Sequence, residues 1–311
     1  MAPDVVALGE PLLEFNATTP GTLQQVRAYE VGYGGDTSNF IVAAARMGAS
    51  TGYLTRLGDD DFGRIFLDLW QAEGVDTSKV ILDPLHPTGI YFISRTGKVH
   101  SFTYYRTHSA ASFLAPQDIP QEYISAARVL HTSGISQAIS NSACDAVFHA
   151  VDIARRAGVR VSYDPNVRLK LWSPGRARSI IIETIRQADF IFPSLEDARF
   201  ITGYEQPEKM AEFFLELGPQ VVALKLGDQG ALLATQDGFL RIPPYRVELF
   251  DATGAGDTFA GAFIAAWLRG CDYADCARFA NTAAALSTQG KGAVNPIPPF
   301  AAVEAALASE S

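Results

Sequence analysis

The chain has 311 residues, of which 48% are hydrophobic and 19% are charged, and it contains 26 glycines and 17 prolines. This composition is typical of a globular protein and excludes a disordered chain, a collagen and a coiled coil. The 25 lysines and arginines against 34 aspartates and glutamates give a formal net charge of -9. Because the chain has no basic run, we expect no nucleic acid among its main partners.

Cysteine usage and hydropathy indicate the environment of the protein. The three cysteines, Cys144, Cys271 and Cys276, lack C-x-x-C spacing, and we expect them to be reduced, as in a cytoplasmic protein. The longest apolar run, residues 260–268, is much shorter than the ~20 residues of a membrane span, so we expect a soluble protein with no membrane partner. The five histidines show no spacing typical of zinc ligands.

Strand-like and helical patterns alternate along most of the chain. Apolar residues at helical spacing predict helices at residues 38–47 and 64–73, and Ser173 followed by Pro174 is typical of a helix start. Short apolar runs predict buried strands at residues 5–8, 51–54, 129–131, 159–163, 190–192 and 221–225. The alternation predicts one α/β domain over residues 1–311, with a mainly parallel sheet covered by helices on both faces.

Two segments, residues 12–31 and 89–106, show strand-like alternation without helices. The second contains the turn Thr96-Gly97-Lys98 and is predicted to form a hairpin. We expect the two segments to form a small β-sheet that projects from the main domain as a lid. An exposed lid sheet is also the expected contact of a homo-oligomer.

The most informative stretch is residues 251–261, D-A-T-G-A-G-D-T-F-A-G, which precedes an apolar, alanine-rich run. Gly254, Ala255 and Gly256 should present free backbone N–H groups at a helix N-terminus, which is an anion site. Asp257 follows in the first helical turn. A carboxylate beside a bound phosphate suits a base that takes a proton from an attacking hydroxyl. The pattern equally suits an acidic residue that interacts with the helix dipole after a glycine turn.

Two other glycine motifs are excluded by the same residues. A dinucleotide-binding fingerprint should follow the first strand and needs a third glycine where Phe259 stands. The chain also contains no G-x-x-x-x-G-K-[ST] motif. Neither a dinucleotide site nor a Walker-type phosphate loop is therefore predicted.

A second glycine-rich stretch, residues 32–39, has the sequence G-Y-G-G-D-T-S-N. Gly34 and Gly35 would let a ligand approach the backbone closely, and Asp36 and Asn39 supply acceptors and donors suited to sugar hydroxyls. Taken alone, the stretch fits a turn and a helix N-cap at least as well.

Together the two stretches resemble the two signatures of the ribokinase-like (PfkB) sugar kinase family. The resemblance runs from Gly9-Glu10 to about Pro298. It implies a ribokinase-like three-layer α/β sandwich with a β lid, ATP as the phosphoryl donor and Mg²⁺ that bridges the phosphates. The resemblance leaves open whether the protein also uses a monovalent cation. It also implies that Asp257 is the base and that residues 254–256 form the anion hole.

The resemblance further implies a nucleotide site. Residues 225–230, K-L-G-D-Q-G, resemble the nucleotide loop of the family. The residues implied to contact nucleotide are Lys225, Gly227, Gly230, Asn166, Ser194 and Asn281. Many members carry N-x-x-E near the metal, where this chain has Pro193-Ser194-Leu195-Glu196. Glu196, with Asp197 beside it, is therefore the implied metal ligand, acting through water.

Within the family, the chain resembles the 2-keto-3-deoxygluconate kinases. The resemblance rests on G-G-D-T at 34–37, T-G-I-Y at 88–91, Y-Y-R at 104–106, H-T-S-G-I-S at 131–136, D-P-N-V-R at 164–168 with L-W-S at 171–173, and G-K-G-A at 290–293. The residues that it implies for the substrate are Tyr91, Tyr104, Tyr105, Arg106 and Arg168. Some members carry an acidic residue near the position of Lys291, and this chain does not.

A sugar acid needs a cation, and the planar fork of arginine matches a carboxylate. For Arg106 or Arg168 alone, a surface ion pair would explain the residue as well. The resemblance implies transfer of the γ-phosphoryl group of ATP to O6 of 2-keto-3-deoxygluconate, which gives 2-keto-3-deoxy-6-phosphogluconate. The alternatives are a neutral-sugar kinase of the fructokinase or ribokinase type and a non-catalytic sugar sensor on the same fold. An intact Asp257 argues against the sensor.

Overall fold

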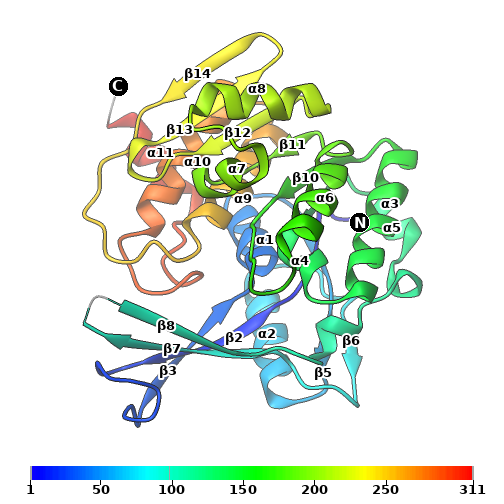
Figure 1. Cartoon of the computed structure of the whole chain (residues 1–311), viewed down its shortest axis with the longest axis vertical. Coiled ribbons are helices and arrows are strands. Elements are labelled where there is room, and N and C mark those ends of the chain that lie inside the picture. Colours follow the sequence, from blue (N-terminus) through cyan, green and yellow to red (C-terminus); the bar gives the residue numbers. More distant parts are fainter. Residues whose placement is uncertain (1, 98, 310–311) are drawn as a thin grey trace.

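The computed structural model describes residues 2–97 and 99–309, and an eight-stranded sheet lies at the centre of this part of the chain (Figure 1). From edge to edge its strands are β14 (Gly238–Ile242), β13 (Ala231–Thr235), β12 (Val221–Lys225), β11 (Phe190–Ile191), β10 (Arg160–Asp164), β9 (Val129–Ser133), β1 (Val5–Leu8) and β4 (Thr51–Leu54). The pairs from β12 to β4 are parallel, whereas β13 and β14 pair antiparallel.

Helices cover both faces of this sheet because buried residues alternate along its strands. In β1, for example, Val5 and Ala7 belong to one hydrophobic core, and Val6 and Leu8 belong to the other. The first core is covered by α1 (Asp36–Arg46), α2 (Asp61–Ala72), α9 (Ala255–Leu268), α10 (Tyr273–Ser287) and α11 (Phe300–Ala308). The second is covered by α3 (Gln121–Ser125), α4 (Gly134–Ala138), α5 (Asn141–Ala157), α6 (Pro174–Ile185), α7 (Leu195–Thr202) and α8 (Pro207–Leu217). The predicted three-layer sandwich with a mainly parallel sheet is confirmed.

The antiparallel edge of the sheet was not among the predicted elements. After β12, the short 3₁₀ turn η3 (Gly227–Gln229) reverses the chain, so β13 returns beside β12 without a crossover helix. Gly230 follows the turn with φ of 84°, and a Cβ there would lie 2.1 Å from the carbonyl oxygen of Ile242. Glycine is therefore required at the point where the segment of residues 225–230 meets β14.

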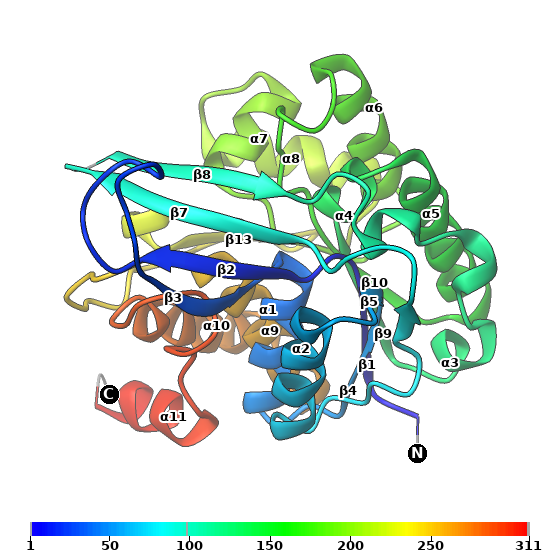
Figure 2. The ribbon, with the colours of Figure 1, turned by 90° about the horizontal axis from the view of Figure 1, so that it is seen from below.

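A separate small sheet lies against one end of the main body (Figures 1 and 2). Its strands, in spatial order, are β3 (Tyr29–Gly34), β2 (Leu12–Ala17), β7 (Ile90–Thr96) and β8 (Val99–Tyr105). The two segments that lacked helices supply these strands, and β7 and β8 form the predicted hairpin. One residue of the predicted turn, Lys98, lies outside the described residues.

Short elements complete the chain. The strands β5 (Arg56–Gly58) and β6 (Ile81–Asp83) form a two-stranded parallel pair, and η1 (Ala110–Phe113) and η2 (Pro116–Asp118) are single 3₁₀ turns. The three cysteines carry free thiols. Within residues 2–97 and 99–309, no helix has both the length and the apolar character that crossing a membrane requires.

Candidate active site

The two glycine-rich stretches come together because α1 and α9 pack closely. A Cβ at Gly261 would lie 2.6 Å from the carbonyl oxygen of Phe40 and 2.9 Å from the Cβ of Ala43. Only glycine permits this approach of the two helices. The N-terminus of α1, with the second glycine stretch, therefore lies beside the N-terminus of α9.

Asp257 lies where the two helix N-termini meet. Its Oδ2 accepts a hydrogen bond from Nδ2 of Asn39 at 2.8 Å. Burial raises the pKa of Asp257, the nearby carboxylate of Asp36 raises it further, and the hydrogen bond from Asn39 opposes the rise. A carboxylate with a raised pKa holds a proton more readily than an exposed aspartate, which suits a general base.

A chain of hydrogen bonds connects α1 to the carboxyl ends of β10 and β12. Nδ2 of Asn166 donates to Oδ2 of Asp36 at 2.7 Å, and the backbone N–H of Asn166 donates to Oδ1 of Asp164 at 3.0 Å. Nζ of Lys225 donates to Oδ2 of Asp164 at 2.6 Å. Burial raises the pKa of Asp164, and the charge of Lys225 opposes that rise. Asp36 and Lys225 thus belong to one network, because the carboxyl ends of parallel strands meet at one edge of the sheet.

The turn that begins α9 has the geometry of an anion site. Gly254 is the N-cap with φ of 75°, a left-handed conformation that favours glycine. A Cβ at Gly256 would lie 3.0 Å from Nζ of Lys225, so the ammonium lies directly over the first turn. The N–H of Ala255 donates to the carbonyl oxygen of Ala252 at 3.2 Å. Of the three residues predicted for the anion hole, Ala255 is therefore already engaged.

The small sheet contributes aromatic side chains to the same region. Tyr91 and Tyr104 are register partners on β7 and β8, and their rings stack with centroids 5.4 Å apart. The hydroxyl of Tyr91 donates to the buried carboxylate of Glu14. It also lies 2.6 Å from the position of a Cβ on Gly34, so glycine is needed for this contact. At Gly35, with φ of 95°, a Cβ would lie 2.3 Å from the carbonyl oxygen of Glu10.

The two predicted arginines differ in their surroundings. Arg106 forms an ion pair with Glu10, whose carboxylate is buried and also accepts from Oγ of Ser109 at 3.2 Å. Burial raises the pKa of Glu10, and Arg106 opposes the rise. Arg168 is exposed, and its Nη1 donates to the carbonyl oxygen of Val167 at 2.9 Å.

Both guanidinium groups act on Tyr104. Burial raises the pKa of Tyr104, and the charges of Arg106 and Arg168 both lower it. The Cζ of Arg106 lies 5.7 Å from the ring centroid of Tyr104. The structure therefore brings Tyr91, Tyr104 and Arg106 together on one side of the small sheet, and the charge of Arg168 acts on the same tyrosine.

Tyr105 lies apart from this group. Successive residues of a strand point to opposite faces, and Tyr105 pairs with Ile90 whereas Tyr104 pairs with Tyr91. The ring of Tyr105 contacts Phe92 at 6.0 Å, is 62% exposed and lines a separate hollow at the start of α2. The structure therefore corrects the expectation that both tyrosines of the Y-Y-R motif face one ligand.

The other residues predicted to contact nucleotide lie around β12 and the segments that follow it. Ser194 caps α7 by accepting from the N–H of Asp197 at 3.1 Å, and it forms a bridge with Lys225. Gly227 begins the turn η3 with φ of 64°. Nδ2 of Asn281 donates to the carbonyl oxygen of Pro243 at 2.9 Å.

The two acidic residues near the predicted metal position are not equivalent. Asp197 is buried and accepts from the N–H of Val167 at 2.9 Å, whereas Glu196 is exposed in the first turn of α7. Among the described residues, no three acidic, histidine or cysteine side chains are grouped as a metal site. One or two carboxylates beside waters and phosphate oxygens are a donor set that fits Mg²⁺, and Glu196 and Asp197 are the carboxylates at this position.

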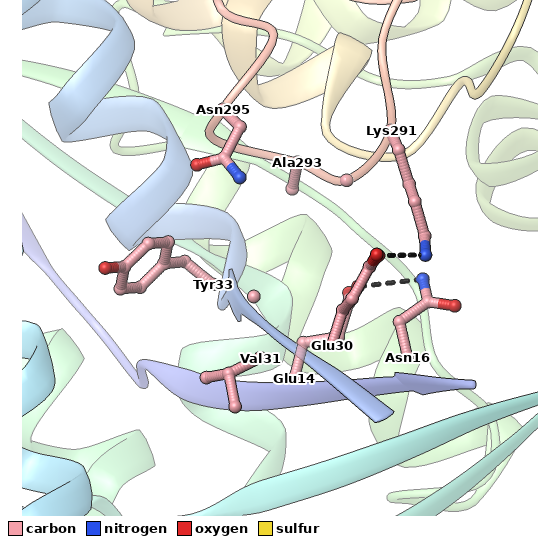
Figure 3. Close-up of a pocket in the computed structure, with 10 residues that line it drawn as sticks. Glu14, Asn16, Glu30, Val31, Tyr33, Lys291, Ala293 and Asn295 are labelled. Atoms are coloured by element: carbon pink, nitrogen blue, oxygen red, sulfur yellow. Dashed lines mark hydrogen bonds and ion pairs between the residues drawn. The ribbon is translucent and has the colours of Figure 1, made fainter. Parts of the chain in front are cut away.

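A cavity of about 100 Å³ adjoins the small sheet (Figure 3). It lies between β2, β3 and the loop of residues 291–295, and its lining includes Glu14, Asn16, Glu30 and Lys291. Lys291 pairs with Glu30, and Nδ2 of Asn16 donates to Glu14 at 3.0 Å. Lys291 thus joins the small sheet to the loop of residues 291–295.

Sequence reasoning missed three acidic residues of this region, Glu10, Glu14 and Asp164. Asp164 could have been recognised, because it directly follows the strand predicted at residues 159–163 and precedes Asn166 and Arg168. Glu10 and Glu14 carry no comparable signal, because their burial becomes visible only when the small sheet covers them.

Comparisons with known proteins give a consistent result. The family model described as pfkB family carbohydrate kinase matches residues 2–299. A 2-dehydro-3-deoxygluconokinase of Thermoproteus tenax is 37% identical, with 94% of this chain and 91% of the relative covered. The enzyme of the same name from Bacillus subtilis (strain 168) is 36% identical, with 95% and 92% covered. Fructokinase-1 of Zea mays is 32% identical, with 96% of each chain covered.

A solved structure matches over almost the whole chain. The crystal structure of a putative ribokinase II from E. coli, in complex with ATP and Mg²⁺, has a TM-score of 0.93 and 28% sequence identity. The match covers 99% of this chain and 99% of the other.

Proposed function

The chain belongs to the pfkB family of carbohydrate kinases, and from this premise we propose that it transfers the γ-phosphoryl group of ATP to O6 of 2-keto-3-deoxygluconate. The products are ADP and 2-keto-3-deoxy-6-phosphogluconate. The observation that carries the choice of a sugar acid is the guanidinium of Arg106, whose Cζ lies 5.7 Å from the ring centroid of Tyr104, together with Arg168, whose charge also lowers the pKa of Tyr104. A carboxylate is the group that such a pair of forks matches.

The acceptor end of the reaction is assigned to α9. Asp257 takes the proton of the O6 hydroxyl as the bond to phosphorus forms. The N–H groups of Gly254 and Gly256 and the ammonium of Lys225 stabilise the negative charge on the transferring group, whereas the N–H of Ala255 is engaged with the carbonyl oxygen of Ala252. Gly34, Gly35, Asp36 and Asn39 hold the sugar between α1 and the small sheet, which acts as a lid that excludes water.

The donor end is assigned to the segments that follow β10, β11 and β12. Nucleotide contacts are proposed for Asn166, Ser194, Lys225, Gly227, Gly230 and Asn281. Mg²⁺, when bound with the phosphates, neutralises part of their charge, and Glu196 is the exposed carboxylate that would hold its waters. A requirement for a monovalent cation is an additional prediction that activity in potassium, sodium and choline salts would test.

Two further expectations accompany this function. The small sheet exposes Val31 (51%) and Tyr105 (62%) on the face away from the site, and we propose that this face forms a homo-oligomer contact. The expected location is the cytoplasm, where ATP and phosphorylated sugars are available.

Lys225 gives a test of the donor site. The Lys225→Met variant should raise KM for ATP by about 10-fold, because a charged hydrogen bond to phosphate is lost. It also leaves Asp164 buried without its partner, so the double variant with Asp164→Asn should recover stability without recovering KM. Lys209→Met, which removes an exposed lysine paired with Glu212, is the control. If KM for ATP is unchanged in Lys225→Met and in its double variant with Asp164→Asn, Lys225 does not belong to the donor site.

The reaction itself is tested by identifying the product. Purified protein is incubated with ATP, Mg²⁺ and 2-keto-3-deoxygluconate, and the product is examined by NMR for phosphorus coupling to C6. Phosphate on O6 is expected. Phosphate on another hydroxyl would overturn the assigned orientation, and sugar binding without ADP release would support a sensor.

A further inference from the structure

Arg46, in the last turn of α1, is bonded at both ends of its guanidinium group. Nε and Nη2 donate to the carboxylate of Glu73 at 3.0 and 2.6 Å. Nη1 points the other way and donates to the carbonyl oxygens of Val294 at 3.0 Å, Asn295 at 3.4 Å and Ile297 at 2.7 Å. The Arg46 side chain is only 21% exposed. A half-buried, charge-assisted cluster of this kind fixes the loop that supplies the carbonyl groups.

That loop supports the turn that begins α9. A Cβ on Gly254 would lie 2.8 Å from the Cβ of Ala293, so the two backbones touch. The N–H of Gly292 donates to Oδ2 of Asp251 at 2.9 Å, and Oδ1 of Asp251 accepts from the N–H and Oγ1 of Thr253 at 3.0 and 2.6 Å. Ala293 and Asn295 lie on the same loop above the small sheet (Figure 3). The loop thus contacts the turn at two places, Asp251 and Gly254.

We infer that Arg46 is a positioning residue for phosphoryl transfer, which holds loop 292–297 against the left-handed turn at Gly254 and so sets the place of the N–H groups of that turn. The inference rests on the proposed kinase function. The hydrogen bonds of Arg46 go to Glu73 and to the loop carbonyl groups, so we assign it no contact with either substrate. Its helix also carries Asn39, which binds Asp257. Near its N-terminus, α1 therefore positions the base Asp257 through Asn39. Near its C-terminus, it positions the loop that supports the anion site through Arg46.

Loss of Arg46 should affect the transition state more than the ground state. Stabilisation of the transferring group depends on donors at fixed positions, and a shift of Gly254 would misplace them. The sugar and the adenosine part of the nucleotide make their contacts elsewhere. We therefore expect kcat to fall while KM for the sugar stays nearly constant.

Arg269 provides a matched control. Its Nη1 donates to the carbonyl oxygen of Met47 at 2.8 Å, one residue beyond Arg46, and its guanidinium lies 4.8 and 4.6 Å from the rings of Phe279 and Phe300. It joins the same end of α1 to α10 and α11. A purely structural role of Arg46 would make the two arginines equivalent in stability and in activity.

The experiment compares Arg46→Met with Arg269→Met on whichever sugar the wild type phosphorylates. We expect kcat to fall at least ~10-fold in Arg46→Met, with KM for the sugar within ~2-fold, and kcat to stay within ~2-fold in Arg269→Met. The affinity for ADP with aluminium fluoride and sugar, which mimics the transferring group, should fall with kcat in Arg46→Met, while the affinity for ADP alone stays constant. A lower Tm with unchanged kcat in Arg46→Met would overturn the inference.

Chemical rescue gives a second measurement should Arg46→Met fold poorly. Guanidinium ion at tens of millimolar should raise the kcat of Arg46→Ala toward the wild-type value and leave that of Arg269→Ala unchanged. The positioning role would be overturned if guanidinium ion fails to rescue a folded Arg46→Ala and if kcat falls equally in Arg46→Ala and Arg269→Ala. If the wild type phosphorylates fructose but not the sugar acid, the proposed substrate is wrong. The role of Arg46 can still be tested with fructose.

Discussion

Asp257→Asn is expected to lower kcat by at least ~10²-fold, the low end of what general-base catalysis contributes. The carboxamide oxygen of the variant still accepts the hydrogen bond from Asn39, so Tm and sugar affinity should stay close to the wild-type values. An amide takes no proton from the O6 hydroxyl. Rate measurements at saturating ATP and sugar, with Tm measured in parallel, provide the check.

The control for this variant is Asp275→Asn. Asp275 lies in the first turn of α10, as Asp257 lies in that of α9, and it pairs with exposed Arg278. If Asp257 only interacted with the helix dipole, the two variants would show similar small losses of stability and no loss of kcat. If Asp257→Asn keeps a near-wild-type kcat, a residue other than Asp257 is therefore the general base.

The pH profile gives a second result for the same residue. The base must be ionised to accept a proton, so activity is lost as pH falls through its pKa. Burial and the charge of Asp36 raise that pKa. We therefore expect kcat/KM to decline on the acid side at a pH above the ordinary aspartate value of about 3.9. A profile that stays flat down to that value would contradict the raised pKa.

Arg168→Ala is expected to raise KM for 2-keto-3-deoxygluconate ~10-fold, about 1.4 kcal/mol, because an exposed arginine forms a charge pair that is worth less than the ~2–5 kcal/mol of a buried one. The substrate carboxylate is far from the transferring phosphoryl group, so kcat should change little. The exposed side chain of Arg168 bonds to the neighbouring carbonyl of Val167, so Tm should not change. Arg168→Lys should rescue only in part, because an ammonium cannot form the fork.

Arg106→Ala needs a different design, because Arg106 pairs with buried Glu10. Removing one partner of a buried pair typically costs ~3–5 kcal/mol of stability, so the single variant should also lower Tm. The double variant Arg106→Ala with Glu10→Gln removes both charges and should recover Tm without recovering KM for the sugar acid. If the Arg168 and Arg106 variants lose kcat/KM equally on the sugar acid and on fructose, neither arginine binds a substrate carboxylate.

The parts of the fold that follow local rules could be predicted from sequence. Residues 5–8 and 221–225 form strands as expected, because continuous apolar runs belong to strands that are buried on both faces. The helix after Gly254 begins where the glycine turn indicates. The antiparallel strands β13 and β14 were missed, because the 3₁₀ turn at residues 227–229 reverses the chain and hydropathy does not show this.

The site was predictable in its types of residue and less so in its geometry. The motifs placed Asp257 and Asn39 in separate stretches, and the packing of Gly261 on α1 brings them within a hydrogen bond. The sequence Tyr104-Tyr105-Arg106 did not show which tyrosine faces the ligand, because strand register decides this. The burial of Glu10 and the role of Arg46 depend on contacts between segments that are distant in the sequence.

Wild-type kcat/KM values for 2-keto-3-deoxygluconate and fructose, measured side by side at saturating ATP and Mg²⁺, decide whether this kinase acts on a sugar acid. The charges of Arg106 and Arg168, which both act on Tyr104, predict a preference for 2-keto-3-deoxygluconate of at least ~10-fold, which corresponds to about 1.4 kcal/mol. Equal values, or a preference for fructose, would contradict the sugar-acid assignment and leave only a carbohydrate kinase of the pfkB family.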